Sequence, residues 1–580
     1  MLSSRRLRGL AGALITALAI SACGGGESGD GSIGGFTGAI GESAWPPADL
    51  PASRSAASRF LSQATFGASD AEIARLETLG YSAWIDDQFR KPASTHLGHY
   101  AQRTAMLEEN QRPRTEWVYE SFWKNAIAGE DSLRQRVAFA LSQIFVVSLA
   151  DGTVAQYPRG VAGYLDMLGE NAFGNFRTLI EDVSLHPMMG LYLSHLRNQK
   201  ADPALGRVPD ENYARELMQL FTIGLHELNQ DGTVRLDSRR EPIETYTNDD
   251  VSGLARVFTG FSWAGPDSSS ARFFGGLAES YRDVTPMRGY PQHHETGPKT
   301  FLGTTITATT PEASLQAALG RLFAHPNVGP FFGRQLIQRL VTSNPSPAYV
   351  SRVAAAFADN GQGVRGDMKA VIRAVLLDPE ARDDLRADDA SWGRLREPIL
   401  RVSAWMRAFG GRSTTGNFTI AQTDDAVSSI GQTPMRAPSV FNWYRPGYVP
   451  PNSSIAAAGL VAPEMQITHE SSVAGYLNAM RSAVQNGFGS NDPATGKRDV
   501  QPDHTPELAL AADPDGLVDR VALLLAADRM SPATRTMIRD AVASVAISSS
   551  NPAAAETARL NRVRLAVFLT LASPDFLVQK

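Results

Sequence analysis

Cysteine is almost absent from this sequence, since its 580 residues contain only one. A single cysteine excludes a disulfide within the chain and a site built from several thiolates, such as structural zinc or iron–sulfur centres. After the N-terminus no apolar run reaches the roughly 18 residues that cross a membrane. A basic excess is also missing, because 55 Lys and Arg face 60 Asp and Glu. This balance argues against a nucleic-acid partner.

Motifs of common catalytic sites are absent as well. The sequence has no G-x-S-x-G, no convincing S-x-x-K, no Walker A and no G-x-G-x-x-G before a helix. His226-Glu227 is followed by Gln230 where H-E-x-x-H needs its second histidine. A run resembling half a calcium loop has Ser238 instead of an acid at position twelve. We therefore predict no metal and no cofactor, and assign no catalytic residue.

The one cysteine lies where a lipid attachment site is expected. Three arginines and a short apolar run, residues 9–20, have the form of a secretory signal. The run ends in Ile20-Ser21-Ala22-Cys23, which resembles a bacterial lipobox. We predict a lipoprotein signal peptide over residues 1–22 and a lipid on Cys23. The alternatives are an ordinary signal peptide with a chance cysteine and a buried core cysteine.

The residues after Cys23 predict a tether at the cell envelope. Residues 23–52 are rich in Gly and Ser, a composition that favours a flexible linker. Position 24 is Gly rather than Asp, which favours the outer membrane if the host has two membranes. The expected partner of this end of the chain is therefore the membrane, reached through the lipid on Cys23.

Helical periodicity dominates from about residue 53 onward. Ser69 to Glu72 is a capping box, and Gly80 ends the helix that it opens. Three amphipathic segments each run into an X-Pro step at which a second helix can begin, namely 176–185, 368–377 and 564–572. Residues 133–147 are apolar nearly all round toward their end, which is typical of a core helix.

These patterns predict a mainly α, multi-helical fold of two packed lobes with a small β-hairpin insertion. About 530 residues follow the tether, more than one hydrophobic core usually holds. We expect an N-terminal helical lobe over 53–310, with the polar cluster and the hairpin, and a C-terminal helical lobe over 311–580. The hairpin is expected around the turn 229–232 and a short strand pair within 300–309. Residues 410–423 and 486–506 are expected to be loops.

The densest polar cluster lies between residues 210 and 299. Asn212 and Glu216 share one helix face, with Arg215 beside them. One interpretation is a carboxylate–amide–guanidinium site for an anionic or sugar ligand, and the other is a structural Arg–Glu network. A capping box of Thr247 and Asp250 explains Asp250 by itself. The candidate polar site comprises Asn212, Arg215, Glu216, Asp250, Arg256, His294 and Lys299.

An aromatic segment stands out in the C-terminal half. Residues 438–448, called the aromatic loop below, place Trp443 and Tyr444 between prolines that make the backbone rigid. Two exposed rings side by side suit stacking on a sugar, whereas buried rings would plug the interface between lobes. The second interpretation is the more common one.

Six of these segments, in the same order, resemble the bacterial domain of unknown function 1800 family. The resemblance runs from about Ser58 to the C-terminus, and it implies an exported protein without an established activity, often encoded beside a secreted protein of another family. That other family looks like the alkaline-phosphatase and sulfatase fold. The resemblance identifies no catalytic residues. The matching segments are 59–67, 211–217, 250–260, 294–303, 396–398 and 438–442.

Two functions remain open at this point. We expect a lipid-anchored envelope protein that binds or assembles with a secreted partner. The alternative is a hydrolase of an envelope or extracellular polymer, with Glu216, Asp250 and His294 as reacting groups and Arg215 as an anion clamp. Convergence of the predicted residues in one open cleft favours the hydrolase, and closed or scattered positions favour the binding protein.

Overall fold

The computed structural model describes residues 49–492 and 495–580, so Cys23, the predicted signal peptide and all but the last residues of the tether lie outside it. The described chain is mainly α-helical, as predicted. The helices of its first part are α2 (Arg54–Ala64), α3 (Asp70–Leu79), α4 (Tyr81–Arg90), α5 (His96–Ala105), α6 (Glu116–Ala128), α7 (Ser132–Ser142), α8 (Pro158–Asn171), α9 (Phe176–Leu185), α10 (Pro187–Tyr192), α11 (Asn212–Glu216) and α12 (Asn248–Val257).

The second part of the described chain is also mainly helical. A π-helical stretch, η3 (Leu217–Thr222), directly follows α11. The remaining helices are α13 (Ser270–Phe273), α14 (Pro311–Phe323), α15 (Val328–Leu340), α16 (Pro347–Ala358), α17 (Met368–Leu376), α18 (Pro379–Arg382), α19 (Asp384–Asp388), α20 (Pro398–Ala408), α21 (Ser454–Ala457), α22 (Glu470–Asn486), α23 (Thr505–Ala509), α24 (Pro514–Ala526), α25 (Pro532–Ala543), α26 (Pro552–Ala572) and α27 (Pro574–Leu577).

Local signals in the sequence account for many helix ends. The Ser69 hydroxyl accepts a hydrogen bond from the Glu72 N–H, and Gly80 follows at φ 80°, which confirms the predicted helix 70–79. The three predicted X-Pro corners are also confirmed. At each corner the residue before proline caps the next helix with its side chain, as His186, Asp378 and Ser573 do for α10, α18 and α27.

Strands are few, short and antiparallel. The predicted pair within 300–309 is confirmed as β3 (Lys299–Phe301) and β4 (Thr304–Ile306). The predicted turn also forms, with a bridge between Leu228 and Val234 and Gly232 at φ 77°. The other pairings are β1 (Phe261–Ser262) with β2 (Arg288–Gly289), β5 (Arg394–Leu395) with β9 (Val578–Gln579), and the sheet β6 (Arg412–Ser413), β8 (Arg498–Gln501), β7 (Phe488–Asn491).

The last sheet shows that the prediction of loops over 410–423 and 486–506 was wrong in part. Its strands lack apolar alternation, and a buried carboxylate holds β6 and the loop after it against β8. Buried Asp499 on β8 accepts hydrogen bonds from the Thr415 and Thr419 N–H groups and from the Ser413 hydroxyl. A polar anchor of this kind leaves no periodic signal in the sequence.

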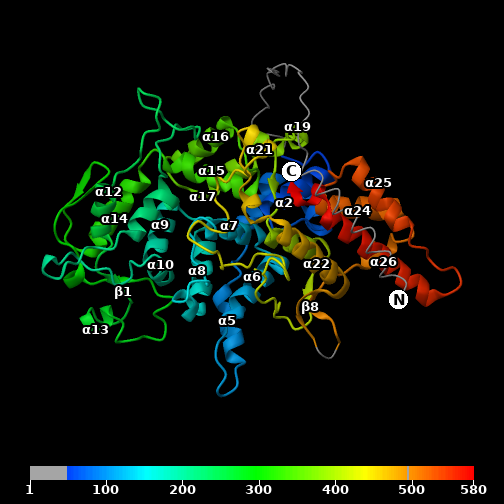
Figure 1. Ribbon diagram of the computed structural model, residues 1–580, viewed down its shortest axis with the longest axis horizontal. Coiled ribbons are helices and arrows are strands. Elements are labelled where there is room, and N and C mark those ends of the chain that lie inside the picture. The colour runs from blue at the N-terminus through cyan, green and yellow to red at the C-terminus, as the bar shows by residue number, and fades with distance from the viewer. Residues whose placement is uncertain (1–48, 493–494) are drawn as a thin grey trace.

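One hydrophobic core runs from Ala57 to Phe576, and the two ends of the chain meet in it. The Ser58 hydroxyl of α2 donates to the Leu523 carbonyl of α24 at 2.7 Å. In Figure 1 the helices α9, α10, α12 and α14 lie at one end of the molecule, α24–α26 lie at the other, and α2 lies nearer the centre beside α24. The first helix therefore packs with the C-terminal helices, although it belongs to the predicted N-terminal lobe 53–310.

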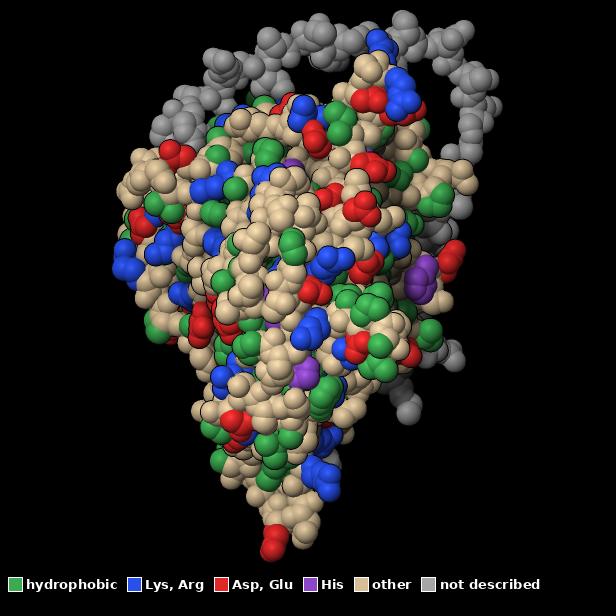
Figure 2. Space-filling view, turned by 90° about the vertical axis from the view of Figure 1, so that its left-hand side faces the viewer, with side chains coloured by type: hydrophobic (Ala, Val, Ile, Leu, Met, Phe, Trp, Pro, Cys, Tyr) green, Lys and Arg blue, Asp and Glu red, His purple; other side chains and the backbone are tan. Residues whose placement is uncertain are grey.

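Helix α7 lies between the two ends and is buried along nearly its whole length, as expected of a core helix, but the predicted extent 133–147 was wrong because the apolar residues 143–147 are buried without being helical. The helix ends at Ser142. The chain after it contacts the segment that precedes the aromatic loop, because the Leu149 N–H donates to the Met435 carbonyl at 2.7 Å. No helix among residues 49–492 and 495–580 is long and apolar enough to cross a membrane. On the face in Figure 2, acidic and basic side chains are interspersed.

Candidate functional site

The residues predicted to form a polar site are spread over three regions of one end of the molecule. Asn212, Arg215 and Glu216 lie on α11, Asp250 and Arg256 on α12, and His294 and Lys299 on the segment that leads into β3. Helices α11 and α12 pack against each other, and α12 packs against β3. Proximity alone does not make a site, so the hydrogen bonds of each residue decide what it can do.

Asp250 has a structural role. One of its carboxylate oxygens accepts from the Thr247 N–H and hydroxyl, both at 2.7 Å, and the other accepts from the Leu302 N–H at 2.6 Å. Partial burial opposes ionisation, but these hydrogen bonds prevail and lower the pKa of Asp250 below its ordinary value. The predicted capping box is therefore confirmed, and Asp250 also ties α12 to the turn after β3.

His294 and Lys299 are buried and bonded to their surroundings. The His294 ring nitrogens lie 2.8 Å from the Thr259 carbonyl oxygen and 2.9 Å from the Ser314 hydroxyl. The Lys299 ammonium donates to the Ala308 carbonyl at 2.8 Å and to that of Gly297. Burial lowers the pKa of both groups. Neither side chain is open to a substrate.

The α11 residues behave differently from one another. Arg215 pairs with Glu211 at 3.4 Å on the surface, and Asn212 is bonded to its neighbours Ser194 and Asp210. Glu216 is only 8% exposed, burial raises its pKa, and its Oε2 has no hydrogen-bond partner among the described residues. Arg256 is exposed.

No hydrogen bond or ion pair within residues 49–492 and 495–580 joins Glu216, Asp250 and His294 to one another. The predicted residues thus include closed structural contacts, surface groups and one buried carboxyl. Among the described residues, no group of three or more His, Cys, Asp or Glu side chains is placed to hold a metal ion.

A cavity of about 460 Å³ lies elsewhere, where the hairpin region, α15 and the aromatic loop meet. This volume falls within the range of about 300–1,000 Å³ that small-ligand pockets occupy. The wall is mostly apolar, and Leu225 and Val234 remain 51% and 42% exposed at its edge. The lining residues come from four segments: Gln143 and Ile144 after α7, residues 219–234 from η3 into the hairpin, Phe331–Arg339 on α15, and Val440–Gly447 of the aromatic loop.

Three polar side chains in the wall are almost fully buried and have atoms without a partner. Gln143, Gln335 and Arg339 are 4%, 7% and 4% exposed. Gln143 Oε1, Gln335 Nε2 and Arg339 Nε make no hydrogen bond within the described chain. An unmet buried hydrogen-bonding group costs about 1–3 kcal/mol. These three atoms have almost no accessible surface, so they lie within the wall and do not face the cavity.

Each of these side chains is held in place by its remaining atoms. The Gln143 amide nitrogen donates to Glu397 Oε2 at 2.6 Å, which fixes the free oxygen of the amide. Arg339 Nη2 donates to the Gln143 carbonyl at 3.0 Å. Gln338, one residue earlier on α15, donates to the Pro446 carbonyl at 3.1 Å and so joins the helix to the aromatic loop. The polar wall is therefore positioned before any ligand arrives.

Behind the wall lies a buried ionic network. Arg394 donates to Glu464 Oε1 from both Nε, at 2.9 Å, and Nη2, at 2.6 Å, and its Nη1 donates to the Arg339 carbonyl. Glu397 accepts from Gln432 at 2.7 Å as well as from Gln143. The Gln143 amide also lies 3.3 Å from the Tyr444 hydroxyl. Tyr444 is buried, so the aromatic loop packs this ring into the protein interior.

Positive charge exceeds negative charge in this network. Two buried carboxylates, Glu397 and Glu464, face five buried arginines, which are Arg136, Arg339, Arg394, Arg396 and Arg401. Burial lowers the pKa of Arg136 to about 9 and that of Arg339 to about 10, and both groups stay charged at neutral pH. Buried charges without partners are costly. The interior beside the cavity is therefore electropositive.

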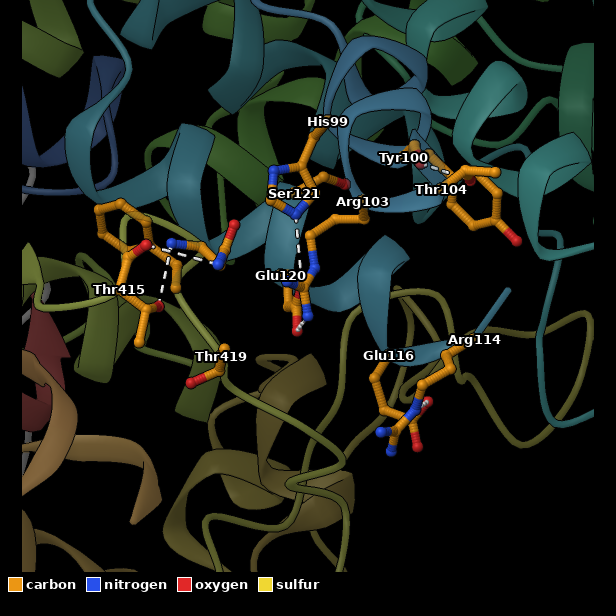
Figure 3. Close-up of polar contacts among 12 residues, drawn as sticks. His99, Tyr100, Arg103, Thr104, Arg114, Glu116, Glu120, Ser121, Thr415 and Thr419 are labelled. Carbon is orange, nitrogen blue, oxygen red and sulfur yellow. Dashed lines mark hydrogen bonds and ion pairs between the residues drawn. The ribbon is translucent and has the colours of Figure 1, made fainter. Parts of the chain in front are cut away.

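A second polar cluster joins α5 to α6 (Figure 3). Glu120 Oε2 lies 3.0 Å from Arg103 Nε and 3.3 Å from His99 Nε2. His99 and Glu120 are buried. One carboxylate thus serves two side chains from the adjacent helix. This arrangement ties the projecting helix α5 to the body of the molecule, and no free reactive group results.

The cavity residues left a signal in the sequence that the motif search did not use. Helix α15 is apolar except for polar residues at two adjacent pairs of positions, 334–335 and 338–339. Gln335, Gln338 and Arg339 are buried and need partners inside the protein, whereas Arg334 is exposed. The remaining contributors are separated by up to about 300 positions and are brought together only by the fold.

Comparison with known proteins adds one match. The family described as protein of unknown function (DUF1800) matches residues 59–578, nearly the whole described chain. No curated protein matches the sequence. No solved structure matches it either.

Proposed function

The chain belongs to the DUF1800 family of proteins of unknown function, and we propose that it is a lipid-anchored cell-envelope protein that binds a secreted partner through the cavity described above. One observation carries this proposal. The cavity wall combines exposed apolar side chains at its edge with polar side chains that hydrogen bonds hold in place deeper in the wall. This combination is typical of ligand sites, in which apolar contacts give affinity and a few polar groups give specificity.

The cavity wall does not favour catalysis. Its lining contains no carboxylate, hydroxyl, thiol or lysine, and His226 is its one imidazole. General acid–base and nucleophilic catalysis each need a reactive group with a partner in hydrogen-bond reach. For the alternative of a polymer hydrolase, Asp250 and His294 would have to release their present backbone contacts. A binding role needs no such rearrangement.

The proposed anchor gives the partner its meeting place. A lipidated Cys23 followed by a flexible tether would hold the folded part at a membrane surface, in the outer membrane if the host has two. A ligand that reaches the cavity there must itself be exported. This reasoning supports a secreted protein as the partner. We propose no nucleic-acid partner.

Site-specific photo-crosslinking tests the binding role. Phe441 lines the cavity and is half-buried, so a benzoylphenylalanine at this position would contact an occupant. The control is the same change at Phe274, which is exposed on another surface. In the native host, we expect ultraviolet light to produce one dominant adduct with an exported protein from position 441 and none from position 274.

Two results would contradict the proposal. Equal adducts from both positions would indicate unspecific contact, and no adduct from position 441 would leave the cavity without an occupant. A hydrolase would instead release fragments of envelope polymer, and this release would fall in the Glu216→Gln and His294→Ala variants. We expect these two variants to keep the adduct at position 441.

A further inference from the structure

We infer that a second pocket, separate from the cavity described above, binds a sugar residue of a neutral glycan. Its walls come from α5, the loop after α5, residues 156–159 and the Asp283 side chain. The volume of about 360 Å³ falls within the range of small-ligand pockets. The two sites share no lining residue, so this inference does not rest on the proposed function.

The Tyr100 hydroxyl is a hydrogen-bonding group that the protein leaves open to this pocket. Tyr100 is only 4% exposed, and Figure 3 shows its ring pointing away from His99 and Glu120. The hydroxyl makes no hydrogen bond within residues 49–492 and 495–580, and it retains some accessible surface. Burial raises the pKa of Tyr100 to about 12, so the hydroxyl is protonated at neutral pH and can both donate and accept.

Arg159 and Asp283 form an ion pair in the same pocket, close enough to Tyr100 to act on its pKa. Arg159 Nε donates to Asp283 Oδ2 at 3.1 Å, and Asp283 is 6% exposed. The Asp283 carboxylate disfavours an anionic ligand, and the two arginines in the wall, Arg112 and Arg159, disfavour a cation. The pocket therefore favours a neutral ligand with hydroxyl groups, which accept from a guanidinium and donate to a carboxylate.

Tyr157, Pro113 and Pro158 supply apolar surface beside these polar groups. The Tyr157 ring is held in place, because it packs against Trp263 with the ring centroids 5.6 Å apart and its hydroxyl accepts from Arg282 at 3.2 Å. A pyranose ring presents C–H groups on its faces and hydroxyl groups around its edge. Its faces therefore suit the tyrosine and the prolines, and its edge suits the polar groups.

A peptide is the other neutral ligand that carries both donors and acceptors. Peptides commonly add to an exposed strand edge or lay a helix in an apolar groove. None of the residues that line this pocket lies on a strand, and an ion pair forms part of its wall. The pocket therefore favours a sugar over a peptide.

Saturation-transfer difference NMR on the full-length protein, purified without glycoside detergents, tests the inference. The probes are hexasaccharides of glucose, mannose, galactose, xylose, rhamnose and N-acetylglucosamine, each measured separately. Hexagalacturonate is the acidic comparison, and a Gly–Ser hexapeptide is the peptide comparison. We expect saturation of the ring protons of at least one neutral hexasaccharide, weaker saturation of hexagalacturonate and none of the hexapeptide.

The Tyr100→Phe variant tests the hydroxyl. Because this hydroxyl has no partner within the described chain, the variant should keep the unfolding temperature of the wild type. Its affinity for the bound hexasaccharide should nevertheless fall about three- to tenfold, as loss of one hydrogen bond predicts. Tyr281→Phe is the matched control, since Tyr281 is exposed and does not line the pocket, and it should change neither quantity.

Two changes at Tyr157 test the apolar face. Tyr157→Phe and Tyr157→Leu both remove the hydroxyl that accepts from Arg282, so their difference reports the ring alone. We expect Tyr157→Leu to bind the hexasaccharide at least about threefold more weakly than Tyr157→Phe.

The remaining outcomes would overturn the inference. Binding of the hexapeptide alone would identify a peptide site, and a preference for hexagalacturonate over every neutral hexasaccharide would identify an anion site. No binding of any neutral hexasaccharide, or binding that Tyr100→Phe and both Tyr157 variants leave unchanged, would remove the sugar from this pocket. None of these results affects the adduct at position 441, which tests the proposed function separately.

Discussion

The Arg394 guanidinium donates two hydrogen bonds to one oxygen of Glu464, from Nε at 2.9 Å and from Nη2 at 2.6 Å. Neither side chain reaches solvent. Arg394 lies on the short strand β5 and Glu464 follows the aromatic loop in the chain. The pair therefore connects the backbone behind the cavity to the segment that closes it.

Removing the acid of this pair should be strongly destabilising. Glu464→Gln leaves Arg394 buried beside four other arginines with one carboxylate fewer. Breaking a buried ion pair costs about 3–5 kcal/mol. Urea denaturation measures this loss. The matched control is Asp519→Asn, which removes an acid from the exposed pair with Arg535 and should cost less than about 1 kcal/mol. Equal costs would contradict a buried, cooperative network.

Acid should destabilise the protein through buried histidines. Burial lowers the pKa of His96 and His195 to about 4 and that of His186 to about 3. Their contribution to stability is complete above the ordinary pKa of 6.5 and falls as the pH drops toward the lowered values. At pH 5 each of the three histidines should lower the free energy of unfolding by about 2 kcal/mol. Asp166, whose pKa burial raises to about 6, acts in the opposite direction.

The His186→Asn variant isolates one of these groups. His186 caps α10 through Nδ1, and asparagine can cap a helix without titrating. The free energy of unfolding of the wild type, measured by urea denaturation, should fall between pH 7 and pH 5 by about 2 kcal/mol more than that of the variant. Parallel curves for the two proteins would exclude His186 as a source of acid sensitivity.

The close packing of α12 on β3 can be tested by comparing alanine substitutions at two glycines, one tightly packed and one in open space. A methyl group added at Gly253 would lie 1.8 Å from the Thr300 carbonyl oxygen, so Gly253→Ala must push the helix from the strand. We expect a loss of about 1–3 kcal/mol or more. Gly320 on α14 has open space around it, and Gly320→Ala should stabilise by about 0.4–1 kcal/mol. The unfolding temperatures of the two variants distinguish these effects. A Gly253→Ala variant as stable as the wild type would argue against the close contact between Gly253 and the Thr300 carbonyl.

Lipid attachment makes a prediction for the N-terminus. Cys23→Ser removes the sulfur that the lipobox pattern presents for modification. Labelled palmitate should enter the wild type and not the variant in the host. A matched change at the neighbouring Ser21→Ala should leave labelling intact. Label in Cys23→Ser would show that the lipid, if present, is attached elsewhere.

The local structure could be predicted because its causes are local. Caps such as Ser69 and Thr247 and corners such as His186-Pro187 act within a few residues, so they are visible in sequence. The helical fold class followed from the same signals. The β6–β8–β7 sheet could not be predicted in this way, since it depends on Asp499, which binds residues about 80 positions earlier.

The candidate site was harder to predict for a related reason. Clustering along the chain drew attention to residues 210–299, but most of that polarity serves caps and buried backbone contacts, as Asp250 and His294 illustrate. The cavity brings together Gln143, Gln335 and Phe441, which are far apart in sequence. Only the folded chain brings these residues together, so the cavity leaves no continuous motif in the sequence.

Hydrogen–deuterium exchange, with and without the exported protein that crosslinks at position 441, tests the central claim most directly. The account predicts slower exchange within residues 219–234 and 440–447, the two segments that supply much of the cavity wall, when this partner is added. Protection confined instead to the separate cavity bounded by Ile420–Ser429 and Asn478–Ser490, or no protection anywhere, would contradict it.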